Sequence, residues 1–170
     1  MQEPDSLRSN DFAMMHLSEV GLWKATEGKK PEDLVQALRG ALASVPDSLA
    51  VLESTAKGVG NFFHREWEAA ERKESAYKPI FIPWFDIEMY RKPLTESVEE
   101  FVSGMNEYDK FLWKIGATLE GINWYNSFKA GERYDEWRMK SEFPSTAQEA
   151  FQSTGSRVFR IEDVLKARAN

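Results

Sequence analysis

Residues 12–20 read FAMMHLSEV, and this stretch decides which fold is expected. Six mostly apolar residues lead into a polar pair, Ser18 and Glu19, and the apolar pattern resumes at Val20. A short, nearly continuous apolar run is typical of a strand that is covered on both faces, as in a parallel sheet. Residues 12–17 are therefore predicted to form such a strand, with a hydroxyl and a carboxylate at its exit.

Two more apolar runs, residues 48–52 and 78–85, are predicted strands, and helical patterns lie between the three. Pro31 suits the first position of a helix that ends near Leu42. Asn61 can cap a second helix, which follows a glycine turn. Strands that alternate with helices predict an α/β fold with a parallel sheet and right-handed crossovers.

The second half of the chain has helical periodicity and no convincing strand from Leu94 onward. The expected helices begin at a capping box between Ser97 and Glu100 and continue to the end of the sequence. They are predicted after residue 97, at 116–131, 134–142 and 146–152 (the last capped by Ser145 and Gln148), and at 161–170. The change of character near residues 86–96 predicts two parts, residues 1–93 and 94–170.

The composition excludes several classes of protein. The 170 residues include no cysteine and two histidines, so disulfide frameworks, thiolate metal sites and histidine-rich centres are excluded. No apolar run approaches the roughly 20 residues that span a bilayer, and we expect a cytoplasmic protein without a membrane contact. The net charge of −6 provides no global positive field, so any contact with DNA needs a local patch.

Polar side chains follow the first two predicted strands: Ser18 and Glu19 after one, and Ser54 and Thr55 after the other. In parallel α/β sheets, ligands bind at the carboxyl ends of the strands. A strand-end hydroxyl or carboxylate can orient Mg²⁺ or its waters, and a second carboxylate can polarise an attacking water. The first strand is similar to a Walker B motif, with Ser18 in place of Asp. The plainer alternative is that these residues only end strands and begin loops.

Four stretches in this order resemble the large terminase subunit of tailed bacteriophages, the ATPase and nuclease that packages viral DNA. They are HLSEVGLWK at 16–24, VLESTAKGVGNFFHREWEAA at 51–70, KPIFIPWFDIEMY at 78–90, and DEWRMKSEFPSTAQEAFQSTGSRVF at 135–159. The resemblance extends from about Ser9 to Phe159 and implies a P-loop NTPase sheet of the RecA-like type, followed by a helical connector.

The resemblance implies a role for each strand-end residue. Glu19 corresponds to the catalytic carboxylate, Ser18 to the magnesium-associated position, and Ser54 and Thr55 to the coupling motif that responds to the γ-phosphate. A hydroxyl is a poorer magnesium ligand than a carboxylate, so no residue is assigned as a certain metal ligand. The implied cofactors are ATP and Mg²⁺. The implied partners are double-stranded DNA, the portal protein, the small terminase subunit and further copies in a ring, within the bacterial host cytoplasm.

The sequence contains no G-x-x-x-x-G-K-[ST] phosphate loop, and the implied nuclease carboxylates would lie beyond Phe159. The chain is therefore expected to be an internal fragment: the second half of the ATPase domain plus the connector. Alone it should be inactive as an ATPase and as a nuclease. Two alternatives stay open, namely a different DNA-translocating ATPase such as a helicase, and a non-catalytic binding or structural module derived from a motor.

Other chemistry-bearing residues have plainer interpretations. Asp86 and Glu88 are expected to be solvated, and His64 with Glu68 offers only two metal ligands at helical spacing. An aromatic set could form a base-stacking platform, but helical core is the better interpretation because basic residues are sparse. The members of this set are Trp113, Trp124, Tyr125, Phe128 and Trp137.

Overall fold

The computed structural model describes residues 13–26, 30–42 and 46–153. The chain divides into two compact units, residues 1–79 and 80–170. The first contains a small parallel sheet with two helices, and the regular elements in the described part of the second are all helices or 3-10 turns. The division falls before the predicted change near residues 86–96, because the segment that contains Trp84 packs into the helical unit.

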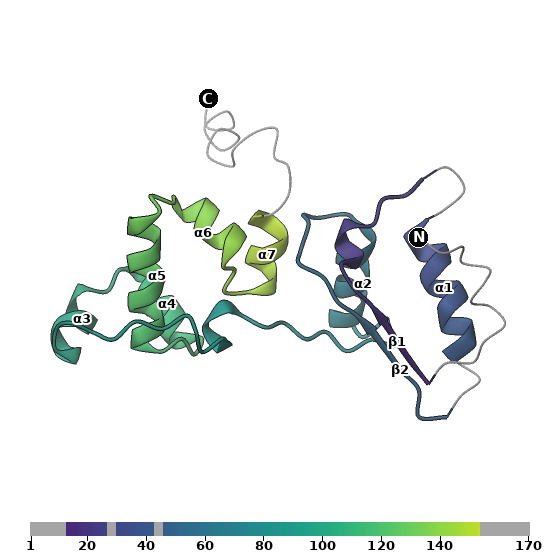
Figure 1. Ribbon diagram of the computed structural model, residues 1–170, viewed down its shortest axis with the longest axis horizontal. Helices are drawn as coiled ribbons and strands as arrows, with labels where there is room; N and C mark the ends of the chain where they lie inside the picture. Colours follow the sequence, from purple (N-terminus) through teal and green to yellow (C-terminus); the bar gives the residue numbers. More distant parts are fainter. Residues whose placement is uncertain (1–12, 27–29, 43–45, 154–170) are drawn as a thin grey trace. The chain divides into compact units, whose positions relative to one another are not determined.

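The first unit contains a strand–helix–strand arrangement (Figure 1). Its elements are β1 (Met14–Leu17), the short 3-10 turn η2 (Val20–Leu22), α1 (Pro31–Leu42), β2 (Leu49–Leu52) and α2 (Phe62–Glu71). The two strands pair in parallel, with Met14 opposite Leu49 and Leu17 opposite Leu52. The predicted parallel pairing of the first two strands is confirmed.

Helix α1 covers one face of the two-stranded sheet. Met15 of β1 is buried with Leu38 and Leu42 of α1. A second cluster, at the carboxyl end of the strands, joins Val20 of η2 to Val35 of α1. Phe62 at the start of α2 completes this cluster, so both helices meet the turn that follows β1. The packing of Val20 against α1 and α2 therefore sets the position of the loop that carries Glu19.

The predicted third strand at residues 78–85 is wrong. Residues 78–83 have no regular structure and are followed by a 3-10 turn, η3 (Trp84–Asp86). Pro79 and Pro83 lack the N–H that a central strand must donate. Ile80 and Ile82 are 70% and 69% exposed, whereas Trp84 is 3% exposed. The apolar pattern therefore reflects one deeply buried tryptophan rather than a strand covered on both faces.

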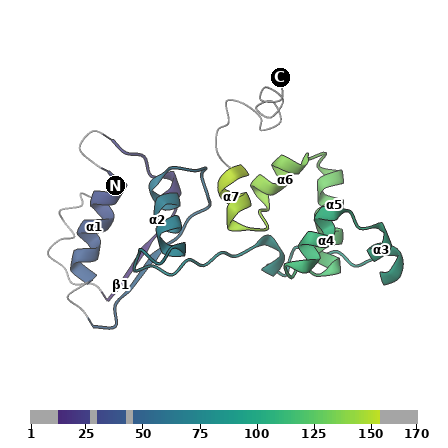
Figure 2. The same ribbon diagram turned by 180° about the vertical axis from the view of Figure 1, so that it is seen from behind.

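The second unit is a set of short helices (Figure 2). Their buried side chains form a core that is rich in aromatic residues. After η3 come α3 (Val98–Gly104), α4 (Glu107–Lys114), α5 (Leu119–Gly131), α6 (Glu136–Glu142) and α7 (Ala147–Ser153). The Trp84 ring stacks on Tyr125 of α5 with centroids 5.1 Å apart. Leu112 and Ile122 are fully buried beside it.

Side-chain caps explain where several helices begin. The predicted caps at Asn61 and at Ser97 with Glu100 are confirmed. The helix after Ser97 is shorter than its apolar pattern suggests, because the Asn106 side chain accepts from two backbone N–H groups and starts α4. At α7 the cap lies one residue later than predicted, since Thr146 accepts from the backbone N–H of Glu149. The predicted helix at 161–170 lies outside the described residues.

Candidate functional site

The two strand ends meet at one edge of the sheet, which we call the strand-end site and define as Ser18, Glu19, Glu53, Ser54 and Thr55. The backbone N–H of Glu53 donates to the carbonyl oxygen of Leu17 at 2.8 Å. The N–H of Val20 donates back to the carbonyl of Glu53 at 3.2 Å. Parallel register thus brings together Ser18, Glu19, Ser54 and Thr55, the four residues predicted from the sequence.

Glu19 occupies a special backbone position. Its φ of 55° and ψ of 35° lie in the left-handed region, which non-glycine residues seldom adopt, and it immediately precedes η2. Its exposed side chain accepts a hydrogen bond from the Thr55 hydroxyl, with Oγ1 and Oε2 3.3 Å apart. Strained backbone is common at functional sites, where the surrounding structure holds it in place. Here the strain places the carboxylate against the exit of the neighbouring strand.

The Ser54 side chain lies directly against the backbone of Gly21. The N–H of Gly21 donates to Ser54 Oγ at 2.9 Å, and this hydroxyl donates to the carbonyl of Thr55 at 2.7 Å. A Cβ atom on Gly21 would lie 2.8 Å from Ser54 Oγ and 3.0 Å from the Thr55 carbonyl oxygen. Only glycine fits between the two strand exits without displacing them.

Glu53 belongs to the site, although its place in the sequence predicted no role for it. Its carboxylate accepts from the Ser18 hydroxyl at 3.3 Å and pairs with His16 Nε2 at 2.9 Å. The His16 and Glu53 side chains are both about half exposed, at 49% and 52%. Parallel pairing was the signal that could have identified Glu53, because it places residue 53 directly after the partner of Leu17.

The glycine turn before α2 leads into the N-cap of that helix, Asn61, and lacks the sequence of a phosphate loop. Gly58 and Gly60 have φ values of 77° and 85°, and Asn61 bridges the turn by donating to the carbonyl of Gly58 at 3.1 Å. His64 Nδ1 lies 3.6 Å from Glu68, at the expected one-turn spacing. Within the described ranges, no three or more His, Asp or Glu side chains gather in a way that could hold a metal ion.

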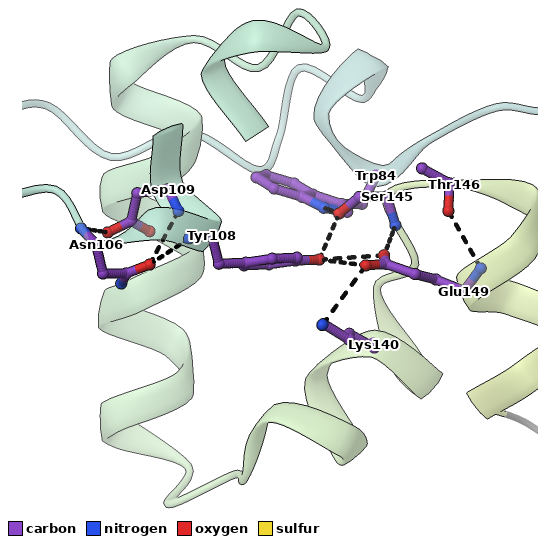
Figure 3. A network of polar contacts seen from close by, with 8 residues as sticks. All are labelled: Trp84, Asn106, Tyr108, Asp109, Lys140, Ser145, Thr146 and Glu149. Atoms are coloured by element: carbon purple, nitrogen blue, oxygen red, sulfur yellow. Dashed lines mark hydrogen bonds and ion pairs between the residues drawn. The ribbon is translucent and has the colours of Figure 1, made fainter. Parts of the chain in front are cut away.

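A second polar network lies in the helical unit and connects three separate parts of it (Figure 3). The Trp84 indole N–H donates to Ser145 Oγ at 2.9 Å, and the Tyr108 hydroxyl lies 3.1 Å from the same oxygen. The Glu149 carboxylate accepts from the Tyr108 hydroxyl at 3.0 Å and from the Ser145 backbone at 2.9 Å. Lys140 is 3.7 Å from this carboxylate. These groups satisfy one another, which indicates a structural role.

Burial changes the acid–base behaviour of two tyrosines in the helical unit. Desolvation raises the pKa of Tyr108 above its ordinary value. Desolvation also raises the pKa of Tyr125, and the neighbouring Tyr108 adds to this effect. Both hydroxyls therefore stay protonated to a higher pH than the hydroxyl of an exposed tyrosine.

The remaining candidates divide between core and surface. Tyr125 is buried, and Trp124 and Phe128 pack against the core, as the core interpretation expected. Trp113 and Trp137 differ from that expectation, since each is 49% exposed. Exposed acids at 86 and 88 agree with the solvated interpretation.

No protein-family model, curated protein or solved structure matches this chain. Over the described residues, no helix combines the length and the apolar character that crossing a bilayer requires.

Proposed function

We propose that this chain is part of an ATP-driven motor of the large-terminase type, which moves double-stranded DNA into phage proheads. In this proposal Glu19 polarises the water that attacks ATP. Ser18 is associated with Mg²⁺, and Ser54 and Thr55 respond to the state of the γ-phosphate. The support comes from the contact between the Thr55 hydroxyl and the Glu19 carboxylate, across the ends of two parallel strands. In this proposal, a change at the Glu19 carboxylate would reach Thr55 through this hydrogen bond.

The chemistry of the strand-end site suits Mg²⁺ bound together with a nucleotide. When bound, Mg²⁺ would neutralise charge that develops on the phosphates. This ion prefers oxygen ligands, and proteins usually hold it through one or two carboxylates, water and substrate phosphates. Ser18, Glu19 and Glu53 offer oxygen atoms only.

The proposal needs a phosphate-binding loop that these 170 residues do not contain. The chain alone should therefore neither bind ATP tightly nor cleave DNA. The proposed partners are double-stranded DNA, the portal protein, the small terminase subunit and further copies in a ring, in the bacterial cytoplasm. With a net charge of −6, contact with DNA would rely on a local basic patch or on another part of the motor.

The proposal is tested with Glu19→Gln in the complete protein that carries these residues and a phosphate loop. Gln keeps the size of the side chain and removes its charge. We expect ATP turnover to fall by about 10²- to 10⁴-fold while ATP binding stays largely intact. Glu71→Gln, which changes an exposed carboxylate at the end of α2, is the matched control. Turnover of the Glu19 variant at the rate of this control would contradict the proposal.

The DNA on both sides of the reading frame separates this proposal from its alternatives. An upstream G-x-x-x-x-G-K-[ST] and a downstream acidic nuclease domain would support the terminase assignment. A second RecA-like domain would indicate a helicase. Unrelated flanks would leave a stand-alone binding module, in which Glu19 has no substrate.

A further inference from the structure

Glu53, at the exit of β2, contacts the exit of β1 through both its backbone and its side chain. Its backbone exchanges hydrogen bonds with Leu17 and Val20. One carboxylate oxygen, Oε1, accepts from Ser18, and the other, Oε2, pairs with His16. The two side chains approach the carboxylate through different oxygens, so its orientation toward position 18 is fixed by contacts on both oxygens.

The stability of the fold does not account for this arrangement. The His16–Glu53 pair is half exposed, and solvent-exposed ion pairs contribute little to the free energy of unfolding. The backbone hydrogen bonds of Glu53 would form with almost any side chain at this position. What its carboxylate adds is a negative charge and an acceptor beside the Ser18 hydroxyl.

A serine has one hydroxyl proton and two acceptor lone pairs. When Ser18 donates its proton to Glu53, the lone pairs of Ser18 Oγ are left available to a water or a cation. A hydrogen-bonded carboxylate behind a ligand also raises the ligand's basicity and fixes its direction. Position 18 carries a neutral serine, and Glu53 brings a carboxylate next to its hydroxyl.

We propose that Glu53 is a positioning residue for Ser18: it orients the hydroxyl and supplies, from the neighbouring strand, the negative charge that position 18 lacks. The inference rests on the proposed function, because the charge acts on Mg²⁺ and its waters at the strand-end site. It predicts that a carboxylate at position 18 and one at position 53 can replace each other.

The first experiment compares melting temperatures of the full chain for Ser18→Asp, Glu53→Gln and the double variant. The introduced carboxylate would face that of Glu53, so we expect Ser18→Asp to lower the melting temperature by roughly 0.5–4 °C. The double variant, which also carries Glu53→Gln, should regain the melting temperature of the unsubstituted chain. Added Mg²⁺ should raise the melting temperature of the single variant Ser18→Asp. Ser18→Asn is the control for size without charge.

Additive effects of the two substitutions would overturn the inference, because they would show that the Glu53 carboxylate does not face position 18. If Ser18→Asp prevents folding, recovery in the double variant supports the inference and continued failure to fold overturns it.

The second experiment uses the complete protein and measures the Mg²⁺ concentration for half-maximal ATP turnover. We expect Glu53→Gln to raise this concentration about fivefold, since one charge near a divalent cation is lost in a hydrated site. The double variant should return to within about twofold of the unsubstituted protein, and Glu71→Gln should have no effect. An unchanged Mg²⁺ requirement in Glu53→Gln would overturn the inference.

The two proposals fail in different ways. Failure of the proposed function would appear as ATP turnover that survives Glu19→Gln. Failure of this inference would appear as additive melting temperatures, a measurement that involves no nucleotide.

Discussion

Gly21→Ala tests whether the two strand exits are packed as closely as the structure indicates. The added Cβ would lie 2.8 Å from Ser54 Oγ and 3.0 Å from the Thr55 carbonyl oxygen. The second atom belongs to the backbone, so relief requires the strand exits to separate. Overpacking of this kind costs about 1–3 kcal/mol. Separation also weakens the hydrogen bond from the Gly21 N–H to Ser54, which contributes about 0.5–1.5 kcal/mol.

Replacing a glycine also stiffens the unfolded chain, which offsets about 0.5–1 kcal/mol of this loss. Together these three effects predict that Gly21→Ala lowers the free energy of unfolding by about 0.5–4 kcal/mol, with a midpoint of roughly 2 kcal/mol. Urea unfolding followed by circular dichroism measures this change.

Gly40→Ala is the matched control. Gly40 is an exposed residue in α1, and a Cβ there would meet no atom within 4 Å. This variant should gain about 0.5–1 kcal/mol from helix propensity. A Gly21→Ala variant that is as stable as Gly40→Ala would refute the close packing of the strand-end site.

Two further predictions concern the helical unit. Burial raises the pKa of Tyr108 and Tyr125, so the folded chain keeps protons that the unfolded chain releases. Their contribution to stability is complete below the ordinary tyrosine pKa of about 10 and decreases as the pH rises above it, by up to about 1.4 kcal/mol per pH unit for each tyrosine. Urea unfolding between about pH 8 and 11 should show this decrease, and Tyr125→Phe should reduce its slope; an unchanged slope would contradict the prediction. Ser145→Ala should lower the free energy of unfolding by about 1–3 kcal/mol, because it leaves the buried Trp84 N–H without its acceptor. Ser103→Ala, at an exposed site in α3, should stay within about 0.5 kcal/mol, and equal effects of the two serine variants would contradict the role of the network in Figure 3.

Local sequence was sufficient for the elements whose signals are contained in a few adjacent residues. Asn61 caps α2, and Ser97 with Glu100 forms a capping box, because a cap depends only on a side chain and the next three backbone N–H groups. The first two strands were also predictable, since each apolar run is bounded by polar residues. The same reasoning placed Ser18, Glu19, Ser54 and Thr55 at one edge, and the structure brings them together.

The predictions of a third strand and of a longer helix after Ser97 differ from the structure for another reason. Residues 78–83 have an apolar pattern that suits a strand, but a strand forms only where a partner accepts its hydrogen bonds, and two prolines reduce what this segment can donate. The apolar pattern after Ser97 continues past Gly104, yet α3 ends at Gly104 and Asn106 caps a separate helix, α4. Periodicity records which side chains are buried and carries no information about which competing local contact prevails.

The sequence by itself determined the helix caps and the polar character of both strand exits, because these follow from neighbouring residues. The alternation of strands with helices also predicted that the first two strands run parallel. Only the tertiary structure decided that Glu53 faces Ser18, that Glu19 adopts a left-handed backbone and that Gly21 leaves no room for a side chain. These features depend on the register between segments more than 30 residues apart, as in the contact of Gly21 with Ser54. The distances between these segments are set by the packing of α1 and α2 on the strand ends, and no local sequence pattern specifies that packing.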